Sequence, residues 1–163
     1  MARSRAARVA FVAALLGSVG WGWFAGSRAA AYRARVVDVV DGDTIVVAYA
    51  DGTRDTVRLL GVDTPETVHR DRPVECFGPE ASAFTNGRLA GRVVTLERDA
   101  QLRDQYGRLL AYVHVEGGHF NAELLRAGYA RTLLIAPNGE RGRELLRAEL
   151  DARAARRGVW ASC

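Results

Sequence analysis

The sequence contains no lysine, so all 23 of its basic residues are arginines. This bias lowers the information carried by any single arginine, because an arginine at an arbitrary position is by default a surface cation. Internal repeats and low-complexity linkers are also absent, which excludes repeat architectures and favours one folded domain in a chain of 163 residues. An arginine therefore counts as functional only where a motif places it.

The part of the chain expected to fold has no excess of positive charge, although the net charge of the whole sequence is +4. Residues 1–35 contain six arginines and no acidic residue, so residues 36–163 carry the other 17 arginines, all 19 acids and a net charge of −2. A field of that sign does not attract a polyanion. Any site for nucleic acid must therefore be local.

Residues 1–31 have the features of a targeting segment. The basic stretch MARSRAAR precedes an uncharged run at residues 9–26, and small residues follow at 29–31. These are the parts of a signal peptide, but a run of 18 residues is also long enough for an uncleaved membrane anchor. Either alternative leaves the arginines in the cytoplasm and residues 32–163, the expected domain, outside it. We therefore expect a protein that is secreted or held at the cell envelope.

The sequence contains two cysteines, Cys76 and Cys163. In an oxidising compartment an even number of cysteines favours a disulfide, here between the last residue and a mid-chain loop, over two free thiols. Closing a loop of nearly ninety residues would stabilise the fold by about 4–5 kcal/mol in the chain-entropy model. Export of the domain therefore predicts this disulfide.

The pattern of apolar residues and turn residues predicts five short strands and three helices. Runs rich in β-branched residues place strands at 33–41, 43–50, 53–62, 92–99 and 108–116. Helical spacing places helices at 79–90, 120–130 and 140–157. This order favours an α+β chain, mainly β, whose strands form a five-stranded OB-fold Greek-key barrel. Such barrels commonly hold oligonucleotides or oligosaccharides, but the fold alone does not assign a function.

Carboxylates lie at two of the predicted turns. Asp43 follows a glycine at the start of a strand, and Asp63 and Glu66 close the stretch VRLLGVDTPE at 57–66. Acidic residues are depleted in strands, and pairing of these strands would bring the acids together. Two carboxylates and a backbone carbonyl suit a hard cation such as Ca²⁺, bound weakly. The alternative is that all three acids cap backbone amides in turns.

Two arginines stand out by their context. Arg58 lies inside an apolar run, on the strand face opposite Val57 and Leu59, and Arg108 follows the residues QYG. Two guanidinium groups around one phosphate would neutralise the charge that develops when a phosphodiester is attacked, and a nearby glutamate could activate water. The alternative is a pair of cross-strand ion pairs with acids such as Asp104. The residues alone leave this choice open.

Five segments of the sequence together resemble the staphylococcal nuclease (thermonuclease) family. They are DGDT at 41–44, VRLLGVDTPET at 57–67, ECFGPEASAF at 75–84, DQYGRLLAY at 104–112 and NAELLRAGYA at 121–130. Each is weak alone, but they follow one another in the family's order, so the set is specific. The resemblance implies a Ca²⁺-dependent OB-fold nuclease that hydrolyses DNA and RNA with little sequence preference and leaves 3′-phosphate ends.

The resemblance also implies roles for individual acidic residues. Asp43 and Asp63 correspond to the calcium-binding aspartates of the family, and Thr64 corresponds to the threonine whose backbone carbonyl completes the protein ligands. Glu66 corresponds to the catalytic glutamate, which acts on the attacking water as a general base. These matches argue against a decayed catalytic site.

The substrate contacts implied by the resemblance are matched only in part. Arg58 and Arg108 correspond to the two arginines that hold the scissile phosphate, and Tyr106 to a substrate-binding tyrosine. Residues 133–136, LLIA, replace a stretch with two tyrosines in the best-known member, and Gln105 replaces a lysine. Base stacking contributes about 1–3 kcal/mol per base, so this change concerns binding strength and nucleotide preference. The phosphate chemistry is not affected.

Two other classes of function compete with a nuclease. A non-catalytic OB-fold module of the same superfamily would bind nucleic acid or protein, but such modules typically lose the acids and arginines that this chain keeps. An OB barrel at the cell envelope could also bind an unrelated anionic polymer. We expect DNA or RNA as the partner, a monomer, and membrane anchoring only through residues 9–26; no protein partner is implied.

Overall fold

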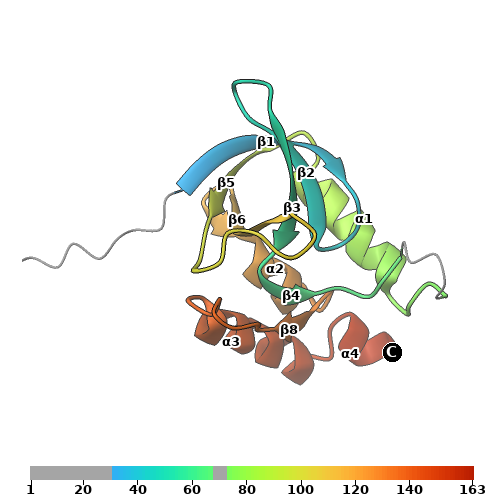
Figure 1. Cartoon of the computed structure of the whole chain (residues 1–163). Helices are drawn as coiled ribbons and strands as arrows, with labels where there is room; N and C mark the ends of the chain where they lie inside the picture. Colours follow the sequence, from blue (N-terminus) through green and yellow to red (C-terminus); the bar gives the residue numbers. More distant parts are fainter. Residues whose placement is uncertain (1–30, 68–72) are drawn as a thin grey trace, which may run out of the picture.

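Five strands close into a barrel in the computed structural model, which describes residues 31–67 and 73–163 (Figure 1). They are β1 (Ala31–Val39), β2 (Thr44–Ala48), β3 (Arg54–Leu59), β5 (Val93–Glu97) and β6 (Leu109–Val115). Antiparallel pairing follows the order β3-β2-β1-β5-β6, and a parallel pairing of β3 with β6 closes the barrel. The expected α+β fold with a five-stranded OB barrel is confirmed.

The described residues also form four helices. They are α1 (Gly78–Leu89), α2 (Phe120–Ala127), α3 (Gly142–Ala154) and the one-turn α4 (Val159–Ser162). The first three lie within a few residues of the predicted helices. Helix α2 packs against both β6 and α3, so it connects the barrel to the outer helices in Figure 1. Its Phe120, Leu124 and Leu125 are fully buried and join the barrel core, where each large apolar side chain contributes about 1.5–3 kcal/mol.

The predicted third strand, 53–62, is two strands in the structure. Strand β3 ends at Leu59, and β4 (Gly61–Asp63) leaves the barrel to pair with β8 (Arg131–Leu133). Gly61 has a φ of +74°, and a side chain on it would collide with Leu145 of α3. The break therefore needs glycine. Like β7 (Gly118–His119), β4 and β8 are too short for a period-2 pattern to reveal.

The buried side chain of Asn121 holds the end of β3 in place. Its Nδ2 donates to the Leu60 carbonyl at 2.8 Å, and its Oδ1 accepts from the Val113 N–H at 2.9 Å. Asn121 is 0% exposed, so both backbone groups are satisfied away from water. One side chain of α2 thus links the break after β3 to the barrel strand β6.

Asp99 holds the loop at 137–140 against the barrel. Its Oδ2 accepts from the N–H groups of Gly139 and Glu140 at 2.8 and 3.0 Å, and from the Tyr112 hydroxyl at 2.9 Å. Burial raises the pKa of the Asp99 carboxyl, but the hydrogen bonds from Glu140, Tyr112, Ala100 and Gly139 outweigh it and keep the pKa below its usual value. The ionised form of Asp99 therefore stabilises the fold.

Cys76 and Cys163 form a disulfide that joins the loop before α1 to the end of α4. Within residues 31–67 and 73–163, no helix combines the length and apolar character needed to cross a membrane. The predicted signal peptide or anchor at residues 1–31 lies outside the described residues, except for Ala31.

Replacing Asn121 tests its role as a link. The substitution Asn121→Ala leaves a buried carbonyl and a buried N–H without partners, at about 1–3 kcal/mol each. We expect the free energy of unfolding in urea to fall by about 2–5 kcal/mol. Asn86→Ala, on the exposed side of α1, is the control and should change it by less than about 0.5 kcal/mol. Equal effects of both substitutions would contradict the assignment.

Acid should remove the contribution of Asp99. Because its pKa is lowered in the folded state, the stabilisation is complete above the unfolded pKa, about 4, and disappears as the pH falls through the folded value. Asp99→Asn should therefore destabilise the protein at pH 7, and its difference from wild type should narrow below about pH 4. Urea unfolding at several pH values measures this difference. A difference in the free energy of unfolding that stayed constant with pH would contradict this role.

Candidate active site

One polar cavity of about 220 Å³ collects the residues predicted to act on phosphate and metal. Its lining consists of Asp41, Asp43, Thr44, Arg58, Asp63, Thr64, Pro65, Glu66 and Arg108. The strand register explains this, since Thr44 of β2 lies opposite Arg58 of β3, and Arg58 pairs with Leu110 of β6. All six residues predicted for catalysis and metal binding therefore lie around a single space.

Arg58 is the most strongly fixed side chain of the cavity. Its Nη2 lies 3.1 Å from Asp43 Oδ2 and 3.2 Å from Asp63 Oδ1, and its Nη1 donates to the carbonyls of Leu59 and Val62 at 3.0 and 2.8 Å. The side chain is 15% exposed. A guanidinium held at both nitrogens in this way needs no reordering to meet an anion.

Asp43 joins the two segments that carry the acids. Its Oδ2 accepts from the backbone N–H of Thr64 at 2.9 Å and from the Thr64 hydroxyl at 3.1 Å, while Oδ1 accepts from the Thr44 hydroxyl at 3.2 Å. The preceding Gly42 packs against Thr64 so closely that a Cβ would lie 2.7 Å from its side chain. The glycine of DGDT thus permits this approach.

Asp41 is a cavity residue to which the sequence patterns assigned no role. Its Oδ1 accepts from the Asp43 N–H at 3.0 Å. Burial, together with the negative charge of Asp43, raises the pKa of Asp41 to about 6. Partial burial also raises the pKa of Asp63, against the opposing charge of Arg58. The position of Asp41 in the DGDT motif was the signal in the sequence that could have identified it. The carboxylates of the cavity lie close enough to repel one another, so an added positive charge would be favourable there.

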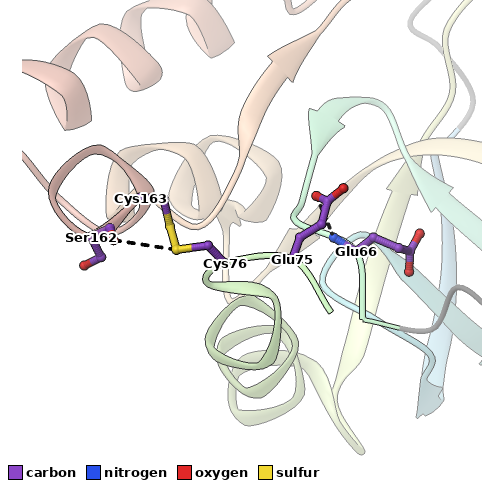
Figure 2. The surroundings of a disulfide bond; sticks show 5 residues. All are labelled: Glu66, Glu75, Cys76, Ser162 and Cys163. Atoms are coloured by element: carbon purple, nitrogen blue, oxygen red, sulfur yellow. Dashed lines mark hydrogen bonds between the residues drawn. A yellow bond between two sulfur atoms is a disulfide. The ribbon is translucent and has the colours of Figure 1, made fainter. Parts of the chain in front are cut away.

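Glu66 lies at the edge of the cavity, after β4. Its backbone N–H donates to Glu75 Oε2 at 3.2 Å, its carbonyl accepts from the Glu75 N–H at 2.9 Å, and its Oε1 accepts from the Thr67 N–H at 2.9 Å. Figure 2 shows the Glu66 carboxylate pointing away from Glu75. The backbone is therefore held on one side while the carboxylate is turned to the other.

Arg108 reaches the cavity from the start of β6. Its Nε donates to Asp104 Oδ2 at 2.7 Å and its N–H donates to Asp104 Oδ1 at 2.9 Å, which is the ion pair that the sequence left open as an alternative. The Arg108 Cζ lies 5.5 Å from the centre of the Tyr106 ring. Asp104 therefore orients a guanidinium that also lines the cavity. The ion pair with Asp104 is thus compatible with a role for Arg108 in phosphate binding.

A second hollow, of about 440 Å³, shares Arg58 and Arg108 with the polar cavity. The exposed Tyr106 lies on its wall, as do Leu133 and Ile135 from the stretch without aromatic residues. The two arginines therefore lie between the polar cavity and a mainly apolar groove.

The oxygen-rich lining of the polar cavity determines which metals it suits. Among residues 31–67 and 73–163, no three His, Cys, Asp or Glu side chains are placed to hold a metal by themselves. Asp43 and Asp63 supply two carboxylates, and the Thr64 carbonyl would be the third donor. Oxygen donors of this kind suit a hard cation and leave positions for water.

Comparisons with known proteins show the family of the chain. Residues 56–162 match the family model described as staphylococcal nuclease homologue. The chain is 41% identical over 128 residues to the thermonuclease of Staphylococcus hyicus, covering 78% of this chain and 75% of that protein. It is 41% identical over 122 residues to the thermonuclease of Staphylococcus intermedius (75% and 72%). An SPbeta prophage-derived endonuclease of Bacillus subtilis is 39% identical over 123 residues (74% and 41%). The chain belongs to the staphylococcal nuclease family.

Proposed function

We propose that this nuclease of the staphylococcal nuclease family is an exported, Ca²⁺-dependent enzyme. It hydrolyses phosphodiester bonds of DNA and RNA with little sequence preference and leaves 3′-phosphate ends. The observation that carries this proposal is the cavity in which Arg58, Arg108 and Glu66 meet the acids Asp43 and Asp63. Residues 1–31 would direct the domain at 32–163 out of the cytoplasm, as a signal peptide or an anchor.

Phosphate binding is assigned to the two arginines. Both guanidinium groups line the cavity, and both are oriented by carboxylates: Arg58 by Asp43 and Asp63, Arg108 by Asp104. Two fixed forks can share the nonbridging oxygens of one phosphate and stabilise the negative charge that increases during attack. Because the folded part of the chain has no excess of positive charge, these two local cations account for the affinity for the phosphate of the substrate.

Glu66 is assigned to the attacking water. Its carboxylate can accept a proton from a water molecule in the cavity while that oxygen bonds to phosphorus. For a 3′-phosphate product, the bond that breaks is the one between phosphorus and the 5′-oxygen, which leaves with a proton. Tyr106 and the apolar groove beside Arg108 would hold the adjoining nucleotide.

The calcium site is assigned to Asp43, Asp63 and the carbonyl of Thr64. The crowded carboxylates of the cavity fit a divalent cation, because positive charge relieves their repulsion and their oxygens are hard ligands. Bound Ca²⁺ would polarise the phosphate and help to orient water. Arg58 contacts both aspartates, so the phosphate-binding group and the metal ligands are held together.

Cleavage assays on the full chain test the function. Plasmid and single-stranded DNA, and an RNA of similar length, are incubated with Ca²⁺ or with a chelator. We expect cleavage only with Ca²⁺, and at least a hundredfold lower rate for Glu66→Ala and for Arg58→Ala, because each removes a proton acceptor or an electrostatic stabiliser.

Matched variants control for surface charge. Glu80→Ala and Arg147→Ala remove exposed residues outside the cavity and should leave the rate within about twofold of wild type. The absence of Ca²⁺-dependent cleavage would overturn the proposal. DNA that is bound but not cut would instead support the non-catalytic module.

Calcium binding can be measured without activity. At a Ca²⁺ concentration ten times the Kd, binding should stabilise the folded chain by about 1.4 kcal/mol and raise the melting temperature. Asp43→Asn should remove this increase, whereas the exposed Asp151→Asn should retain it. The comparison uses the shift caused by Ca²⁺ within each variant, so any intrinsic destabilisation cancels. An unchanged shift in Asp43→Asn would contradict the assigned ligand.

A further inference from the structure

The segment Glu75–Gly78 supports the backbone of Glu66. Glu75 both donates to the Glu66 carbonyl and accepts from its N–H, at 2.9 and 3.2 Å (Figure 2). Gly78 packs so closely that a Cβ would lie 2.7 Å from Thr67 Cγ2 and 3.0 Å from the Glu66 carbonyl oxygen. The place of Glu66 therefore depends on where this segment lies.

A covalent bond holds that segment. Cys76 follows Glu75 directly and is bonded to Cys163, with a Cα–Cα distance of 6.0 Å. Its Sγ lies 3.6 Å from the Ser162 carbonyl oxygen (Figure 2). The helix that ends in Ser162 is anchored by Val159, which is buried and donates to the Gly128 carbonyl at 2.9 Å. The disulfide thus connects the segment that holds the backbone of Glu66 to the end of α4. Both cysteines are exposed to solvent.

Phe77 of this segment stacks on Tyr129 with ring centroids 5.4 Å apart, but Glu75 and Cys76 border a cavity. A cavity of about 190 Å³ lies between the loop and the disulfide, lined by Asp63, Thr64, Pro65, Glu75, Cys76, Arg131, Val159 and Cys163. A loop beside a cavity lacks the contacts that fix a core residue. The hydrogen bonds of Glu75 and the disulfide therefore add to this ring contact in holding the segment beside Glu66.

We propose that the Cys76–Cys163 disulfide, acting through Glu75, positions Glu66, so that the full catalytic rate requires the oxidised protein. This inference rests on the proposed function, in which Glu66 acts on water. Misplacing a reacting group by about 1 Å can cost about a hundredfold in rate. Arg58 lies on a barrel strand and is held by the carboxylates of Asp43 and Asp63 and by two backbone carbonyls, so substrate binding should persist.

An external dithiol supplies the reducing electrons. Its thiolate attacks one sulfur of the disulfide, and the other cysteine leaves as a thiolate that takes up a proton. The second thiol of the reagent then displaces the first cysteine, so the reagent becomes a cyclic disulfide and the protein gains two thiols. Reoxidation reverses the change.

Kinetics of the full chain before and after treatment with dithiothreitol test the proposal. We expect kcat to fall about tenfold, with KM for DNA changed by less than about twofold, and reoxidation to restore kcat. The variant Cys76→Ser with Cys163→Ser should have the low kcat and should not respond to dithiothreitol. A kcat that is unaffected by reduction, or a loss that lies in KM, would overturn the proposal.

Variants of Glu75 keep the test independent of folding without the disulfide. Glu75→Ala removes the acceptor for the Glu66 N–H and should lower kcat about tenfold with the disulfide intact. Glu75→Gln keeps an oxygen acceptor, so it should stay within about twofold of wild type, as should exposed Glu80→Ala. Reduction of the disulfide in the Glu75→Ala variant should lower kcat by less than the product of the two separate fold-losses, because both changes act through one contact. Independent, multiplying losses would contradict the proposed path.

The outcomes separate this inference from the proposed function. If the oxidised wild type shows no Ca²⁺-dependent cleavage, both fail. If it cleaves DNA but reduction and Glu75→Ala leave kcat unchanged, only the positioning role fails.

Discussion

The guanidinium of Arg58 is the interaction on which the site depends. It contacts the carboxylates of Asp43 and Asp63 and donates to the carbonyls of Leu59 and Val62. These partners come from the start of β2, the end of β3 and strand β4. One cation therefore balances two neighbouring negative charges and also fixes the turn between β3 and β4. Removing it would leave carboxylates facing each other in a cavity, which is costly for a buried group such as Asp43.

That turn exists because the chain leaves the barrel at Gly61. The positive φ at this residue and its close approach to Leu145 direct β4 toward β8, away from the barrel wall. Asn121 holds the same corner from the opposite side through the Leu60 carbonyl. Asp63 at the end of β4, and Glu66 after it, consequently follow a segment that pairs with β8 and contacts α2 and α3. Their geometry depends on the packing of the helices as much as on the strands.

Most of the strands and helices could be predicted from local patterns, whereas roles for the cavity residues came only from the resemblance to the family. Alternation placed Arg58 opposite Val57 and Leu59, and the structure buries the latter two while Arg58 faces the cavity. The break at Gly61 could not be predicted, because an apolar run with one glycine looks like a continuous strand. Nor could the contacts of Asp41 and Glu75, since they depend on tertiary packing across turns. Motif matches assigned roles to residues, but only the folded chain shows what holds each one.

The proposed catalytic groups are held in two different ways. Arg58 and the acid Asp43 belong to barrel strands or their ends, where hydrogen-bonded neighbours and a packed core fix them. Glu66 belongs to a loop beside a cavity, where its backbone N–H donates to Glu75 and its carbonyl accepts from Glu75, next to a disulfide. Stabilising the charge of the transition state requires rigidly held cations, because a preorganised group spends no free energy on reorganisation during the reaction. The proton acceptor must also be accurately placed, and in this chain a covalent bond supports the segment that holds its backbone. An oxidising environment would then be a condition for full activity as well as for stability.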